Sequence, residues 1–142
     1  MNTFLPYSDF EMSAKALDQT RLWKQVLECD QIEKSVILIQ AGAPPAIIPW
    51  RHHPAVVQWS RHLVGLVFYR NVMLAACIRR GIRTTKRPER LTLPIPLPSW
   101  IGDEAFHASH RSNLLRKDPA WYGQFGWIEP HDLPYIWPSK TS

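Results

Sequence analysis

The chain has 142 residues, of which 45% are hydrophobic, so it is long enough to form one domain with its own core. Its 17 lysines and arginines exceed its 12 aspartates and glutamates, and the net charge of +5 mildly favours a polyanionic partner. Two cysteines exclude a disulfide-framework domain, and no signal segment or apolar run of membrane-spanning length is visible, so we expect a cytoplasmic monomer with no membrane partner.

The N-terminal third predicts two helices followed by a loop. Ser8–Glu11 (SDFE) fits a capping box, with a hydroxyl at the cap and a carboxylate three residues later, and predicts a short helix over about Asp9–Ala16. A longer helix is predicted over about Asp18–Ile39, with the aspartate as its cap. Gln40–Pro49 contains three prolines and a glycine, which indicates a loop.

The middle of the chain predicts the longest helix, His53–Arg80. Proline suits its first turn, Gly81 is a natural stop, and apolar residues surround much of its circumference, so we expect it to be the central core element. Arg83–Arg90 then predicts a basic loop. Leu91–Pro98 alternates prolines with aliphatic residues, which predicts a packed, polyproline-like segment rather than a central strand.

The C-terminal part predicts one more helix and an irregular tail. The helix opens at Gly102-Asp103 and closes near Asp118, where a proline follows. Pro119–Gly126 is expected to form at most a short helical turn, and the end of the chain, rich in tryptophan and proline, to wrap over the core. These patterns predict an all-α fold: a compact single domain over residues 1–142, with three main helices and irregular connections.

Three polar residues share one edge of the second predicted helix. Arg21 and Glu28 fall within about 20° of each other on a helical wheel, and Gln25 lies one turn from each. The adjoining arc is apolar and is expected to be buried. From the spacing alone, these side chains form either a half-buried network that fixes helix packing or the edge of an active site.

Other residues are candidates for contact with a polyanion. Arg51, His52 and His53 precede a helix start, where free amides attract anions. His107, His110 and Arg111 share one face of the last helix. Trp121 and Tyr122 either cover the core or, as the family resemblance described below implies, stack on bases. The two histidines of the last helix could instead bind a metal ion or make structural hydrogen bonds, but no diagnostic metal motif is present and no cofactor is predicted.

The motifs, taken in order, resemble the pyrimidine-dimer DNA glycosylase/AP lyase family and its uncharacterised bacterial relatives. No single motif is diagnostic, and the resemblance depends on their common order along nearly the whole chain. The motifs are TFLPYSDF (3–10), LDQTRLWKQVLE (17–28), WRHHPAVVQW (50–59), LAACIRRGI (74–82), GDEAFHASHRSNLLRKDPAWY (102–122) and DLPYIWP (132–138).

The resemblance implies a compact all-α enzyme in which the N-terminal α-amine attacks the sugar of a damaged nucleotide and forms a Schiff base. The amine would belong to Met1, or to Asn2 if the initiator methionine is removed; asparagine is a poor second residue for that removal. Glu28 follows Leu22 by six residues, a spacing similar to that of the family's catalytic glutamate, and is expected to assist at the sugar. The residue before this glutamate is leucine rather than the family's usual arginine.

The implied partner is double-stranded DNA with a damaged or modified base, in a nucleoid-associated protein. The cationic candidates are expected to bind phosphates and the aromatic candidates to stack on bases. The candidates for DNA contact are Arg21, Lys24, Gln25, Arg51, His52, His53, His107, His110, Arg111, Trp121 and Tyr122. Two other functions stay open from the sequence. One is a non-catalytic DNA-binding module of the same fold, and the other is a metal-dependent hydrolase that uses the histidine cluster.

Overall fold

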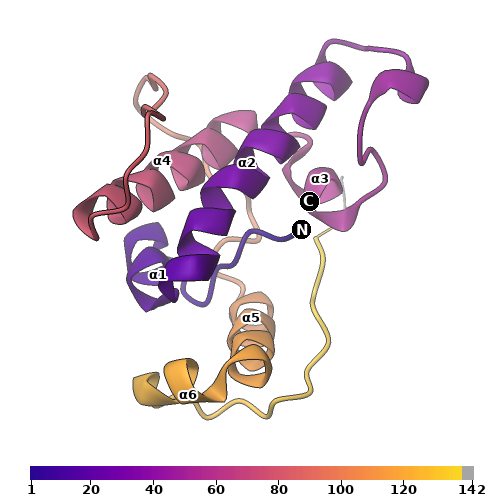
Figure 1. Cartoon of the computed structure of the whole chain (residues 1–142). Coiled ribbons are helices and arrows are strands. Elements are labelled where there is room, and N and C mark those ends of the chain that lie inside the picture. The colour runs from indigo at the N-terminus through magenta and orange to yellow at the C-terminus, as the bar shows by residue number, and fades with distance from the viewer. Residues whose placement is uncertain (139–142) are drawn as a thin grey trace.

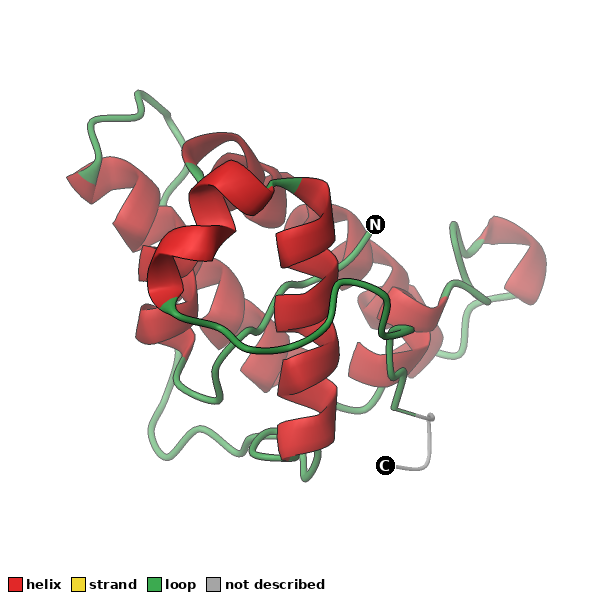
Figure 2. Cartoon of the chain, turned by 90° about the horizontal axis from the view of Figure 1, so that it is seen from below, coloured by secondary structure: helices red, strands yellow, loops and turns green. Residues whose placement is uncertain are grey.

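Helices and irregular connections make up the computed structural model, which describes residues 1–138 and has no strand within them (Figures 1 and 2). The all-α prediction is therefore confirmed. No helix in the described part of the chain has the length and apolar character needed to cross a bilayer. The elements are α1 (Phe10–Ala16), α2 (Gln19–Gln40), η1 (Pro45–Ile47), α3 (Pro54–Trp59), α4 (Leu63–Arg79), α5 (Glu104–Lys117), α6 (Pro119–Tyr122) and η2 (Gly123–Phe125).

Aspartates begin the helices that the sequence predicted best. The Asp9 side chain accepts the backbone N–H of Met12, so the cap of α1 is Asp9 and not Ser8. Asp18 caps α2 in the same way, and Asp103 caps α5. A side-chain oxygen at this position satisfies one of the free amides of the first turn.

The prediction of a single helix from His53 to Arg80 is wrong, because the chain turns between α3 and α4. Ser60 ends α3, where its hydroxyl donates to the carbonyl of Val57, and the N–H of His62 donates to the carbonyl of Trp59. Neither proline nor glycine marks this break in the sequence. The longest helix is consequently α2, with 22 residues. Because of the turn, α3 does not continue the line of α4 (Figure 1).

The core lies mainly between α2 and α4. Its α2 face consists of Leu22, Val26, Cys29, Ile32 and Val36, all fully buried, and α4 supplies side chains that include Leu66, Tyr69 and Met73. Residues three and four positions apart recur on one face of α2, as expected of a helix that buries one side. This packing fixes α2, and so fixes the polar edge that adjoins its apolar face.

The connections after α4 differ in part from the prediction. Gly81, at φ 82°, follows the end of α4 as expected. Leu91–Pro98 is irregular and packed only in part, since Pro98 is buried while the side chains of Leu93 and Leu97 are 84% and 45% exposed. Beyond η2 the tail is irregular and runs past α5 back toward the start of the chain (Figure 1).

Candidate active site

The first residues form an extended stretch, residues 2–7, which passes between α2 and α5 and is referred to below as the N-terminal segment. It belongs to no sheet, so side chains must satisfy its backbone groups. On the α2 side, the N–H of Asn2 donates to Oε2 of Glu28 at 2.9 Å, and the N–H of Phe4 donates to Oε1 of Gln25 at 2.7 Å. The Tyr69 hydroxyl lies 2.7 Å from the carbonyl oxygen of Phe4.

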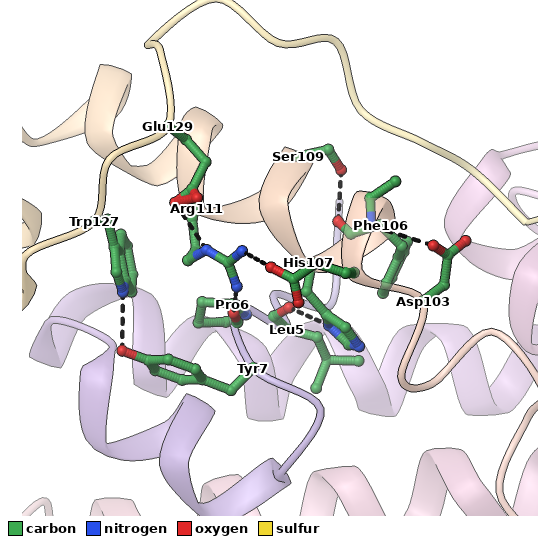
Figure 3. Close-up of polar contacts among 12 residues, drawn as sticks. Leu5, Pro6, Tyr7, Asp103, Phe106, His107, Ser109, Arg111, Trp127 and Glu129 are labelled. Atoms are coloured by element: carbon green, nitrogen blue, oxygen red, sulfur yellow. Dashed lines mark hydrogen bonds and ion pairs between the residues drawn. The ribbon is translucent and has the colours of Figure 1, made fainter.

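On its other side the N-terminal segment is bound by α5, from which His107 and Arg111 point toward it (Figure 3). His110 Nδ1 accepts the N–H of Leu5 at 2.8 Å, and His107 Nδ1 lies 2.8 Å from the carbonyl oxygen of the same residue, to which it donates. Arg111 Nη1 donates to the carbonyl of Pro6 at 2.7 Å. Together with Glu28 and Gln25, these side chains fix the position of the start of the chain.

The prediction that His107, His110 and Arg111 contact DNA is at odds with this placement. They are 2%, 0% and 8% exposed, and all three side chains bind the backbone of the N-terminal segment. Burial lowers the pKa of His110 to about 3, with a smaller contribution from His107, so the ring is neutral. Arg111 also pairs with Glu104 and with Glu129 (Figure 3). These bonds support the alternative in which the side chains make structural hydrogen bonds inside the protein.

These bonds also leave little capacity for a metal ion at the histidine pair. Both nitrogens of His107 are engaged, since Nε2 accepts the N–H of Gly102 at 2.9 Å while Nδ1 faces Leu5. Within residues 1–138, no group of three or more His, Cys, Asp or Glu side chains is arranged to hold a metal. The residues predicted to be catalytic lie at the other end of the N-terminal segment.

A cleft of about 290 Å³ opens there, and the predicted catalytic residues Met1, Asn2 and Glu28 all line it. Gln25 contributes to its wall from α2. Its remaining lining includes the basic side chains Arg21, Lys24 and Lys117 and the aromatic side chains Tyr135 and Trp137. Among the described residues that line the cleft, Glu28 is the one carboxylate. A single acid surrounded by cations suits a phosphate-bearing ligand.

Arg21 is held at the edge of the cleft rather than in its centre. Its Nη1 lies 3.2 Å from Oδ1 of Asp18, which also accepts the hydroxyl of Tyr122. Burial acts to raise the pKa of Asp18, but the bonds from Tyr122 and Arg21 outweigh it and hold this pKa below its usual value. The carboxylate thus stays charged and keeps the guanidinium in place.

The predicted Arg51–His53 cluster is divided by the structure. Arg51 and His52 line a separate cavity of about 350 Å³, together with apolar residues such as Ile39 and Val57. His53 instead lies beside the cleft, with its ring in edge contact with Trp137. Burial lowers the pKa of His53, and the positive α-amine of Met1 lowers it further while Glu28 opposes both, so the amine and the carboxylate act electrostatically on this ring.

The two aromatic candidates of α6 lie away from the cleft. Tyr122 is fully buried, and burial raises its pKa well above the usual value, so its predicted contact with DNA gives way to the alternative in which it covers the core. Trp121 is 38% exposed and its indole N–H donates to the carbonyl of Ala16 at 2.8 Å. The aromatic side chains that do line the cleft, Tyr135 and Trp137, belong to the tail, where no periodic pattern predicts their orientation.

The part of the chain that contains the predicted catalytic residues also matches a known protein family. Residues 1–89, more than half of the chain, match the sequence model of a family described as pyrimidine dimer DNA glycosylase. The matched part contains the N-terminal segment, all of α2 and His53, but neither α5 nor the tail. No curated protein and no solved structure matched the chain.

Proposed function

Because the chain belongs to the pyrimidine dimer DNA glycosylase family, we propose that it removes a damaged pyrimidine from double-stranded DNA through an N-terminal amine and Glu28, and then cuts the strand as an AP lyase. One observation supports this proposal above the others. The backbone nitrogen of Asn2 lies 2.9 Å from the Glu28 carboxylate, inside a cleft that is lined with cations.

The proposed reaction begins with the uncharged α-amine, whose electron pair attacks C1′ of the damaged nucleotide. The C1′–N1 bond breaks and its electron pair passes to the pyrimidine, which takes up a proton from water and, when the lesion is a dimer, stays joined to the neighbouring pyrimidine. The nitrogen then loses a proton to Glu28, which passes it to O4′ as the C1′–O4′ bond breaks and the sugar ring opens. A Schiff base remains between the protein and C1′. An α-amine suits this role because far more of it is unprotonated at neutral pH than of a lysine amine.

Strand cleavage follows from the same intermediate. The Schiff base acidifies the proton on C2′, its removal forms a double bond to C3′, and the 3′ phosphate leaves with the C3′–O electron pair. Glu28 is placed to stabilise positive charge at the sugar and to move these protons. Water finally hydrolyses the Schiff base and releases the protein.

The identity of the reactive amine depends on whether Met1 is kept. With Met1 in place the amine lies one residue before the Asn2 nitrogen, and both residues line the cleft. After removal of Met1, the Asn2 nitrogen itself becomes the amine at 2.9 Å from Glu28. An intact-mass measurement of the purified protein identifies the first residue.

Borohydride trapping tests the proposed function. A duplex with one thymine dimer and a duplex with one abasic site are incubated with the protein and sodium borohydride, which reduces a Schiff base to a stable adduct. We expect an adduct on the tryptic peptide Met1–Lys15. An adduct on another peptide contradicts the proposed nucleophile. Salt-dependent binding without base release or adduct indicates the non-catalytic DNA-binding module instead.

Glu28→Gln is the matching variant. The glutamine oxygen can still accept the N–H of Asn2, so the fold is retained while the charge is lost. We expect base release to fall by roughly 10²- to 10⁴-fold, as for the loss of a catalytic acid–base group. Glu11→Gln, which removes an exposed carboxylate of α1 outside the cleft, serves as the control. Equal rates for both variants contradict a role for Glu28.

A further inference from the structure

Trp50, in the loop between α2 and α3, has a backbone conformation that tryptophan rarely adopts. Its φ is 56°, in the left-handed region, and it is the one non-glycine residue with positive φ within residues 1–138. The conformation costs free energy for a side chain of this size, so it persists only where its surroundings impose it. Such strain at a bulky residue calls for an explanation in terms of function.

Backbone hydrogen bonds on both sides impose this conformation. Before Trp50, the hydroxyl of Ser35 on α2 donates to the carbonyl of Pro49 at 2.6 Å. At Trp50 itself, the carbonyl accepts the N–H of His53 at 2.8 Å. Ser35 is fully buried, so the loop is fixed to the body of the protein at this point.

The side chain gains little burial in return, since Trp50 is 59% exposed. A tryptophan normally buries most of its large apolar surface. In this loop the fold holds the ring in solvent in a fixed position, which is the arrangement expected of a binding residue.

The ring lies at the border of the candidate active site. His53 is in edge contact with Trp50 on one side and with Trp137 on the other, at centroid distances of 6.2 and 6.3 Å. Trp137 lines the cleft together with Glu28. Next to Trp50 along the chain are Arg51, which is half-buried, and His52, which is exposed. An exposed aromatic ring next to an arginine suits a nucleobase with its phosphate.

We propose that Trp50 stacks on an unstacked base next to the damaged nucleotide. This inference rests on the proposed function, which brings DNA to the cleft. It adds a contact that can form with a damaged duplex, in which a base has lost its stacking partner. An intact duplex keeps its bases stacked on each other and offers no free face to the ring. Trp50 would therefore favour binding to DNA in which the lesion has already weakened stacking.

The test compares affinities for two duplexes that the protein cannot cleave. One contains a tetrahydrofuran analogue of an abasic site and the other is undamaged. Trp50→Gly removes the ring and relieves the strain, because glycine adopts positive φ freely. We expect affinity for the analogue duplex to fall by roughly 5- to 100-fold, the range for one base–aromatic stack, and affinity for the undamaged duplex by less than about twofold. Trp50→Phe should keep most of the affinity.

Three further measurements make the result decisive. Thermal unfolding should show Trp50→Gly to be at least as stable as the wild type, and Ile128→Ala, which shortens a side chain 93% exposed on the tail, should bind both duplexes as the wild type does. Cleavage of the glycosidic bond in the thymine-dimer duplex, detected as a strand break after alkali treatment, is measured in parallel on the wild type. If the wild type cleaves this bond and Trp50→Gly binds equally well, or loses affinity equally for both duplexes, the stacking role is overturned and the proposed function stands. If the wild type neither binds the duplex nor cleaves the bond, both proposals fall.

Discussion

At the scale of the residue, His110 makes the stability of the protein depend on pH. Its Nδ1 accepts the N–H of Leu5, so protonation of this nitrogen would break the bond that holds the N-terminal segment to α5. Burial lowers its pKa to about 3, well below the ordinary histidine value of 6.5. The unfolded chain therefore takes up a proton that the folded chain refuses, and stability falls as the pH drops from about 6.5 toward 3.

We predict that His110→Asn reduces this loss of stability in acid. The asparagine oxygen can accept the N–H of Leu5 but does not titrate. Between pH 6 and 4, the free energy of unfolding of the wild type should fall with pH by up to about 1.4 kcal/mol per pH unit more than that of the variant. Urea unfolding at several pH values measures this difference. His131→Asn, at an exposed histidine of the tail, is the control. Parallel slopes for wild type and His110→Asn would contradict the prediction.

At the scale of elements, the basic loop after α4 is fixed more firmly than its composition suggests. Arg70 on α4 and Lys86 in the loop both lie 2.7 Å from the Asp30 carboxylate of α2. The same arrangement brings Glu33 of α2 next to Glu89 of the loop. Burial and this neighbouring carboxylate raise the pKa of Glu33 to about 7.

We predict that Glu33→Gln stabilises the protein above neutral pH. The folded chain holds a proton on Glu33 that the unfolded chain releases, so the wild type loses stability as the pH rises from about 4.5 to 7. After allowance for solvent screening of this half-exposed group, the gain at pH 8 should be about 1 kcal/mol, with little gain at pH 5. Thermal unfolding at both pH values measures it, with Glu11→Gln as control. A larger gain at pH 5 than at pH 8 would refute the assignment of this effect to the raised pKa of Glu33.

Sequence patterns predicted the helices correctly where neighbouring residues determine their ends. Aspartate caps and helical periodicity located α2 and α5 within about one residue. The resemblance to the glycosylase family pointed to Glu28, which lines the cleft. The turn between α3 and α4 was missed because tertiary packing causes it and no proline or glycine marks it. The bonds of His107 and His110 were not predictable because their partner is the backbone of Leu5, more than 100 positions away. The loop motif around Trp50 likewise carried no sign of positive φ.

At the scale of the whole molecule, the fold places only some of the positively charged side chains at the cleft. Lys24 of α2 and Lys117 of α5 line the cleft, although they are far apart in sequence. Lys34 lies elsewhere on α2, in a separate depression beside Asp30. The net charge alone does not distinguish these lysines, but the fold does.

We predict that Lys24→Ala and Lys117→Ala each reduce the salt dependence of binding to a thymine-dimer duplex. Each lysine that neutralises a phosphate releases counterions, so its loss should lower the slope of log K against log salt by about 1. Fluorescence anisotropy at several salt concentrations measures the slope. Lys34→Ala should keep the slope of the wild type. An equal change in all three variants would show that the charge acts without regard to position.

The crossing of residues 2–7 between α2 and α5 also has a consequence for biosynthesis. Leu5 and Pro6 leave the ribosome well before the α5 side chains that bind them, which follow 102 and 105 positions later. A polypeptide that ends before α5 lacks these bonds, and contacts between such distant positions form slowly during folding. The N-terminal segment is thus held on both sides only after α5 has been synthesised, so the wall of the cleft that this segment forms becomes ordered late.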